Sequence, residues 1–396
     1  MKKLIGNLIQ GLFLISSTVT TLTVLLIVFF LFSEGLSMFK ESPLEGENIL
    51  AVHSNNKVKT VSAEQIKNIF DRKITHWSEI GGSADSIILF TSQDFDTYFN
   101  ADELGPKFEH LPRKIDSLIN STPGIIAVFS SRYIPPHFRG KLIEVSNVSL
   151  NSFMSGREWF PTAHPAVQLG VLPLILGTLW VSLIAILIAL PIGLATSIYM
   201  AEVASVRMRN LLKPVIELLA GIPSVVYGFF GLIIIVPMIQ DIFNLPVGET
   251  ALAGSIVLAI MALPTIITVS EDALRNTPRA MKEASLALGA NRWQTIRRVV
   301  IPYSISGIAA AAILGIGRAI GETMAVLMVT GNAAIIPHTI LQPVRTIPAT
   351  IAAELGEAPN GGIHYKALFA LGCILFVLTL IINLWVEYIS RSRKNR

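Results

Sequence analysis

Six apolar runs dominate this chain and set the kind of fold it can adopt. A run of about 20 apolar residues is the length that a helix needs to cross a bilayer. The runs extend approximately over Gly11–Phe32, Val171–Met200, Val215–Gln240, Ala251–Val269, Tyr303–Gly331 and Ala367–Val386. The composition agrees, because 52% of the 396 residues are hydrophobic and only 15% are charged, less charge than globular chains carry. We therefore predict an α-helical membrane protein with six transmembrane helices.

The distribution of Lys and Arg predicts the direction of these spans. Basic residues precede the first run, follow the last, and gather between the second and third and between the fourth and fifth. The remaining loops are poor in cations: Asp241–Thr250 has none and Asn332–Tyr365 has only Arg345. By the positive-inside rule, both termini are cytoplasmic and the chain is a multi-pass protein of the cytoplasmic (inner) membrane.

The first run has two readings, a secretory signal or a retained helix. Lys2 and Lys3 before an apolar stretch fit a signal. However, the apolar stretch is too long for one, and Ser33–Gly35 matches a cleavage site only weakly. These features favour a retained helix.

The polar segment after the first run alternates between strand and helix patterns. Strands are expected at Ile49–His53, Ile87–Thr91 and Ile125–Phe129, and helices after the capping box Ser62–Gln65 and from Leu111-Pro112. This alternation predicts a small α/β domain. The predicted domains are residues 1–33 (cytoplasmic N-terminus and first helix), 34–166 (extracytoplasmic α/β insert) and 167–396 (five helices with a cytoplasmic loop at 271–302).

The insert resembles one lobe of the phosphate-binding proteins of ABC importers. The segments that carry the resemblance are Val61–Phe70, Lys73–Gly82 and Ser121–Ala127. That family grips phosphate partly with a Ser-Gly-Thr cluster at a helix start, where backbone N–H groups face the anion. The corresponding Thr91–Thr97 lacks the glycine, and Asp94 and Asp96 would repel an anion. We therefore predict a degenerate lobe that docks a partner or gates transport; a spacer without a role in transport is the alternative.

The loop between the fourth and fifth runs carries the most specific motif. Glu283-Ala284-Ser285, then Gly289, then Val299–Pro302 is similar to the signature of ABC importer permeases. That signature reads Glu-Ala-Ala, three residues, Gly, nine residues and Ile-x-Leu-Pro. The resemblance implies a coupling helix that docks on a separate ATPase subunit, with Glu283, Ala284, Gly289 and Pro302 in the coupling segment. A basic amphipathic loop lying on anionic lipid is the alternative.

The local sequence of this loop predicts two short helices. Thr277 is expected to cap the first, with Pro278 in its first turn. Gly289 is expected to end that helix, because glycine readily takes a positive φ. A second helix is expected near Arg292–Val300.

The chain shows no chemistry of its own. Nothing matches Gly-x-x-x-x-Gly-Lys-Ser/Thr, and no His, Cys and carboxylate cluster has metal-ligand spacing. We predict that it is not an enzyme, binds no cofactor or nucleic acid, and depends on ATP used by a partner chain.

Arg318 lies near the midpoint of the fifth run, where a cation costs about 2.5–3.5 kcal/mol even on a lenient scale. Glu322 follows four residues later, so on a continuous helix the two share one face. Gly317 and Gly321 lie on the adjoining face, where small residues let another helix approach. Two readings are open, a structural ion pair between helices and a charged station on an anion pathway. The second is preferred.

The stretch around Arg318 resembles the phosphate permeases. Gly315–Val326 carries that resemblance, and Phe153–Trp159, Glu217–Gly228 and Thr350–Tyr365 look like the C-type subunit of the phosphate-specific transporter. The resemblance implies that Arg318, Glu322 and Thr323 belong to the pathway of inorganic phosphate. It also implies a second, A-type permease, a dimer of B-type ATPase subunits and an extracytoplasmic phosphate-binding protein, assembled in membrane lipid. The alternatives are a sulfate or molybdate permease, a homodimer, and a phosphate-sensing scaffold without transport.

Overall fold

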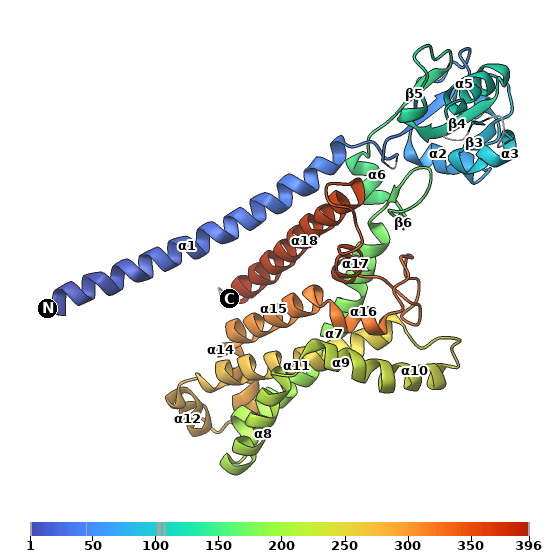
Figure 1. The fold of residues 1–396 in the computed structure, drawn as a ribbon. Coiled ribbons are helices and arrows are strands. Elements are labelled where there is room, and N and C mark those ends of the chain that lie inside the picture. The colour runs from blue at the N-terminus through green and yellow to red at the C-terminus, as the bar shows by residue number, and fades with distance from the viewer. Residues whose placement is uncertain (1, 45, 101–103, 106–107, 395–396) are drawn as a thin grey trace. The chain divides into compact units, whose positions relative to one another are not determined.

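The computed structural model describes residues 2–44, 46–100, 104–105 and 108–394 (Figure 1). The chain divides into two compact units. One comprises Met1–Val171 with Ala358–Ala370, and the other Leu172–Glu357 with Leu371–Arg396. We call them the sheet unit and the helical unit.

The sheet unit contains a five-stranded mixed sheet in the order β2-β5-β1-β4-β3. The strands are β1 (Asn48–Val52), β2 (Thr60–Val61), β3 (Ile88–Thr91), β4 (Ile125–Ser130) and β5 (Lys141–Val145). Strand β1 runs antiparallel to β4 and β5, whereas β3 is parallel to β4 and β2 is parallel to β5. The expected strands are thus confirmed to within two residues, and so is the α/β character of this region.

Two helices bury their apolar sides in separate cores of this unit. Side chains alternate between the faces of a strand, and in β1 Leu50 joins one cluster while Ala51 joins the other. Helix α2 (Ala63–Phe70) contributes Ile66 to the first cluster, and α5 (Leu111–Ser121) contributes Ile115 to the second.

The predicted start signals of both helices are confirmed. Ser62 and Gln65 form the reciprocal capping box of α2, and Pro112 lies in the first turn of α5. The shorter elements are η1 (Met38–Lys40), η2 (Trp77–Ile80), η3 (Ser92–Asp94), α3 (Phe95–Tyr98), η4 (Ser131–Tyr133), α6 (Leu150–Ser155), β6 (Trp159–Phe160) and β7 (Gln168–Leu169).

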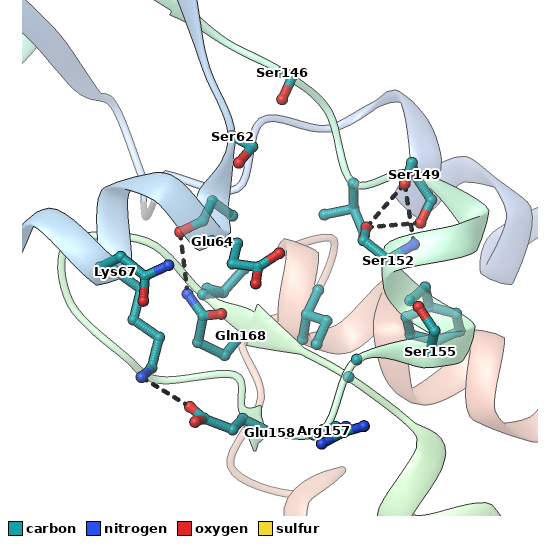
Figure 2. Close-up of a pocket in the computed structure, with 18 of the residues that line it drawn as sticks. Ser62, Glu64, Lys67, Ser146, Ser149, Ser152, Ser155, Arg157, Glu158 and Gln168 are labelled. Carbon is teal, nitrogen blue, oxygen red and sulfur yellow. Dashed lines mark hydrogen bonds and ion pairs between the residues drawn. The ribbon is translucent and has the colours of Figure 1, made fainter. Parts of the chain in front are cut away.

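A polar cavity of about 560 Å³ lies in the sheet unit between α2 and the segment around α6 (Figure 2). Lys67 crosses its edge, with its Nζ 2.7 Å from Asp71 and 3.0 Å from Glu158. Hydrogen bonds to these two carboxylates raise the pKa of Lys67. None of the predicted pathway or coupling residues lines this cavity.

The helical unit is built around α11 (Ala251–Arg275), which packs against α7 (Leu172–Ile198), α15 (Ile305–Gly321) and α8 (Val206–Ala220). The other elements are the π-helical turns η5 (Tyr199–Val203), η6 (Gly231–Ile235) and η7 (Ile296–Val300), and α9 (Ser224–Phe230), α10 (Val236–Phe243), α12 (Arg279–Ala287), α13 (Arg292–Thr295), α14 (Ile301–Tyr303), α16 (Met324–Val329) and α17 (Ile347–Glu354). Helix α18 (Ile363–Lys394) divides between the two units.

Five helices in the described residues are long and apolar enough to cross a membrane, and a bent pair makes a sixth candidate. These five are Ile9–Lys40 (which overlaps α1, Lys2–Ser37), Leu172–Val203, Ser224–Phe243, Ala251–Arg275 and Ile363–Tyr388. The bent pair is Arg292–Tyr303 with Ile305–Gly321, at 69°. The chain is therefore a helical membrane protein with an N-terminal α/β region, as predicted.

Two of the predicted runs are not continuous helices. The run Val215–Gln240 breaks at Gly221, and a new helix starts at Ser224 after Pro223. Proline ends a helix before it because it lacks the N–H and restricts the preceding residue. The run Tyr303–Gly331 breaks after Gly321, where Glu322 adopts an extended backbone with φ −70° and ψ 133°.

Candidate functional site

Arg318 lies in the last turn of α15, not in the middle of a long helix. The last carbonyls of a helix have no intrahelical donor, and a cation there interacts favourably with the helix dipole. The guanidinium Nη1 donates a hydrogen bond to Thr265 Oγ1 of α11 at 3.3 Å. Both side chains are half-buried. The helix break therefore gives Arg318 a polar setting that a continuous apolar helix would not provide.

The expected shared face of Arg318 and Glu322 is corrected by the structure. Because α15 ends at Gly321, the two residues are not one turn apart on a single helix. Glu322 Oε1 instead accepts a hydrogen bond from the Ala325 N–H at 3.4 Å, at the start of α16. Among the described residues, no ion pair joins Arg318 to a carboxylate. The reading as a structural ion pair with Glu322 thus loses its basis.

Thr323 completes the break between α15 and α16. Its Oγ1 donates to the Gly321 carbonyl at 3.3 Å, which satisfies one of the free carbonyls at the helix end. A Cβ added at Gly317 or Gly321 would meet nothing within 4 Å. The glycine face, expected to let another helix approach, is therefore open in this chain.

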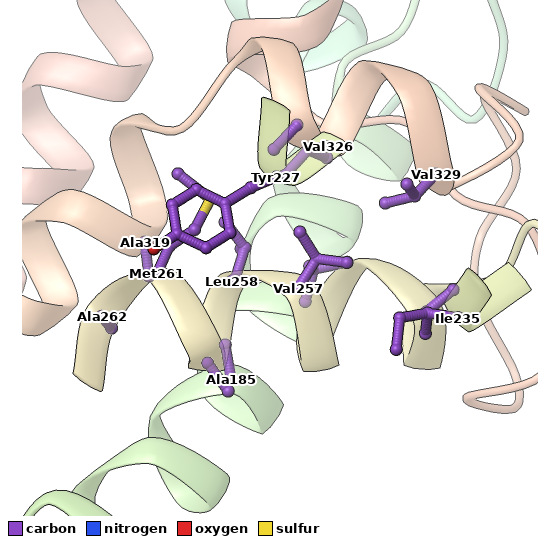
Figure 3. Close-up of a cluster of buried hydrophobic side chains, with 14 of the residues drawn as sticks. Ala185, Tyr227, Ile235, Val257, Leu258, Met261, Ala262, Ala319, Val326 and Val329 are labelled. Carbon is purple, nitrogen blue, oxygen red and sulfur yellow. The ribbon is translucent and has the colours of Figure 1, made fainter. Parts of the chain in front are cut away.

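Buried packing on both sides of the break fixes α15 in place. Ala319, next to Arg318, belongs to the same buried cluster as Tyr227 and Met261 (Figure 3). Val326 of α16 belongs to it as well. Interiors are close-packed, so this cluster holds the two helix ends that flank Glu322 and Thr323.

The coupling segment is a pair of short helices with an exposed apolar tip. Helix α12 contains Glu283 and Ala284, both exposed, and Gly289 follows it with φ +87°, as predicted. Leu288 is 90% exposed and Trp293 is 61% exposed. Such exposed apolar residues on a protruding loop are typical of an interaction surface.

Side-chain contacts attach this tip to the helices behind it. Ser285 Oγ and Thr295 Oγ1 lie 3.0 Å apart and join α12 to α13. Lys282 forms an ion pair with Glu202 of η5. Pro302, the last residue of the motif, lies in α14, at the bend into α15. The motif residues therefore form one continuous segment that ends where the Arg318 helix begins.

The predicted cap at Thr277 is wrong. Pro278 occupies the N-cap position of α12 without a side-chain cap, so Thr277 lies one residue too early to reach the free N–H groups. Its buried hydroxyl lies 3.1 Å from Ser304 Oγ, which in turn donates to the Ala273 carbonyl at 2.9 Å. Thr277 therefore links the loop to the start of α15.

In the sheet unit, Asp94 of the segment Thr91–Thr97 is bonded to Thr91. Asp94 Oδ2 accepts hydrogen bonds from both the N–H and the hydroxyl of Thr91, each at 2.8 Å. The carboxylate thus satisfies two donors of Thr91 at the start of η3. The repulsion of anions by Asp94 stays a prediction.

Sequence reasoning missed Thr265 and Glu202 as partners of the predicted residues. The only local signal was Pro264 inside an apolar run, which indicates a helix irregularity but not a contact with Arg318. Both contacts join positions far apart in the chain, Thr265 with Arg318 and Glu202 with Lys282.

Comparison with known proteins places these features in context. The chain is 41% identical over 250 residues to the probable ABC transporter permease protein YqgH of Bacillus subtilis. This alignment covers 63% of this chain and 81% of the relative. It is 38% identical over 256 residues to the phosphate transport system permease protein PstC of Mesorhizobium japonicum, covering 60% and 77%.

A solved structure also matches part of the chain. A putative phosphate ABC transporter substrate-binding protein from Clostridium perfringens covers 28% of this chain and 49% of its own, at 25% identity and a TM-score of 0.20. That score is too low to support an argument about function.

The family match covers most of the helical unit, from residue 193 onward, and the coupling segment. Residues 193–395 match the binding-protein-dependent transport system inner membrane components, a span that includes Arg318, Glu283 and Gly289. This chain belongs to that family of transport permeases.

Proposed function

We propose that this ABC importer permease carries inorganic phosphate and is the C-type subunit of its transporter. The observation that carries the proposal is the half-buried Arg318, whose guanidinium bonds to a neutral hydroxyl rather than to a carboxylate. A guanidinium presents a fork of donors that matches phosphate geometry. The PstC name of the Mesorhizobium relative points to the same cargo.

Membership of the family implies three classes of partner, and we propose which type of protein fills each class. As a permease component of the inner membrane, the chain is not itself an ATPase and works with an ATPase, a binding protein and a partner permease. We assign these as a B-type ATPase dimer, a phosphate-binding protein and an A-type permease. The exposed Leu288 and Trp293 would contact the ATPase. Because the ATPase acts on the cytoplasmic side, this contact requires that both termini are cytoplasmic and that residues 34–166 lie on the outer side.

The mechanism follows from the continuity of the coupling segment with α15. Closure of the ATPase dimer would move α12 and α13, and the Ser285–Thr295 contact would carry both as one body. The displacement would pass through α14 to α15 and so shift Arg318. Arg318 would offset the desolvation of the anion, and Glu322 and Thr323 would hold the helix break beside it. Residues 34–166 would dock a partner.

The test is radiolabelled phosphate uptake by cells that lack other phosphate importers. Arg318→Gln is expected to lower uptake by about 10-fold or more, because a hydrogen-bonded charge contributes about 1.5–3 kcal/mol. Arg207→Gln, an exposed arginine on α8, is the matched control and should leave uptake unchanged. If the Arg318→Gln variant took up phosphate as fast as the wild type at equal membrane expression, the proposal would be wrong. Stronger competition by sulfate or molybdate than by arsenate would assign a different oxyanion.

A further inference from the structure

Thr265 is the side chain to which the Arg318 guanidinium donates a hydrogen bond in the part of the chain that the structure describes. It follows Pro264 in α11, and its Oγ1 accepts the 3.3 Å hydrogen bond from Nη1. Thr268, one turn further along the same helix, is also half-buried but has no such contact. The difference between these two threonines singles out position 265.

We infer that Thr265 is a positioning residue for the anion pathway, acting through Arg318. This inference rests on the proposed function, since it concerns how the proposed anion station is held. Thr265 would not touch the transported anion in this role. It would hold the guanidinium plane in one orientation against α11.

A neutral hydroxyl suits this role better than a carboxylate. Guanidinium has five N–H donors, and the bond to Thr265 uses one of them. A carboxylate partner would neutralise the charge and compete with the anion for the fork of donors. The hydroxyl leaves the charge and the remaining donors of Arg318 available. Glu322, the nearest predicted carboxylate in sequence, instead accepts from the Ala325 N–H.

Close packing of α11 against α15 makes Thr265 an effective anchor. Ile266, the next residue, is fully buried, and a Cβ added at Gly315 of α15 would come within 2.9 Å of it. The close approach of α11 and α15 at Gly315 lies one turn before Arg318. Displacement of either helix would therefore change the Thr265–Arg318 distance directly.

The experiment uses the complete transporter in proteoliposomes with its ATPase, partner permease and phosphate-loaded binding protein. Thr265→Val removes the hydroxyl at nearly constant volume, Thr265→Ser keeps it, and Thr268→Val is the matched control. We expect Thr265→Val to lower the maximal rate at least about 10-fold, as for loss of one hydrogen bond to a charged group. The KM for loaded binding protein should stay within about two-fold, because docking is untouched, and Thr265→Ser should restore the rate.

A double-mutant cycle separates positioning from general packing. In an Arg318→Lys background, which keeps the charge but loses the fork, Thr265→Val should lower the rate much less than it does alone. An equal loss in both backgrounds, or a wild-type rate for Thr265→Val, would overturn the inference while leaving the proposed function intact. Phosphate uptake at the wild-type rate by the Arg318→Gln variant would instead overturn both the inference and the proposed function.

Discussion

Single residues in this chain show how buried charge is tolerated near the membrane. Glu271 of α11 is fully buried, with Lys213 Nζ of α8 at 3.2 Å and Arg275 Nη1 at 3.5 Å. Neither contact is a well-aligned hydrogen bond, so the carboxylate is held by charge from two sides. Removing one partner of a buried ion pair is strongly unfavourable, because it leaves the other charge buried and uncompensated.

Lys213→Ala should destabilise the helical unit by up to about 3–5 kcal/mol, because it removes one of the two cations that contact the fully buried Glu271 carboxylate. The thermal unfolding midpoint of the purified protein in detergent measures this effect. Asp272→Asn is the control, since Asp272 contacts the same lysine at 3.3 Å but its side chain is 60% exposed. The control should cost at most about 1 kcal/mol. Equal midpoints for both variants would contradict the argument.

At the scale of elements, the coupling segment combines a rigid base with an exposed tip. Gly289 takes φ +87°, which residues with a Cβ rarely adopt, and so turns the chain between α12 and α13. The hydroxyl contact between Ser285 and Thr295 then holds the two helices together. Leu288 projects from this turn and is 90% exposed.

Leu288→Asp should weaken binding of the ATPase without unfolding the permease. An apolar side chain that is 90% exposed contributes little to folding, but burying it in a partner's groove contributes about 1.5–3 kcal/mol. Co-purification of the ATPase should fall at least about 10-fold while the thermal midpoint stays constant. Leu150→Asp, at a 63% exposed position on α6, is the control and should retain the ATPase. Full ATPase recovery with Leu288→Asp would refute this contact.

At the scale of the whole molecule, the two units have separate hydrophobic cores. Phe90 is fully buried among sheet-unit side chains, and Ile266 is fully buried in the cluster around α11. The two clusters share no residue. Units with independent cores unfold as separate cooperative groups.

Phe90→Ala should therefore destabilise one unit without the other. We expect a loss of about 3–5 kcal/mol, seen as faster hydrogen exchange in peptides from β1 to β5 and unchanged exchange in α7 and α11. Ile266→Ala should produce the reverse pattern, at about 2–5 kcal/mol. Faster exchange in both units for each variant would show that the cores unfold together.

The sequence alone predicted the features that depend on local periodicity and composition. The capping box at Ser62, the strands of the sheet and the apolar helices follow from neighbouring residues, and the structure contains them. The positive φ at Gly289 was predictable for the same reason, since a glycine that ends a helix commonly takes it. The proposed roles of Glu283, Ala284, Gly289 and Pro302 remain predictions.

Only the tertiary structure decided what surrounds Arg318. Apolar periodicity continues from Tyr303 to Gly331 through the break, because hydrophobic pattern does not record backbone geometry at Gly321 and Glu322. The partner of Arg318 lies 53 positions away in the chain, on a helix whose own pattern does not indicate the contact. Spacing had suggested a carboxylate beside the cation. Packing of α15 against α11 instead supplied a hydroxyl, which leaves the positive charge uncompensated by any described ion pair.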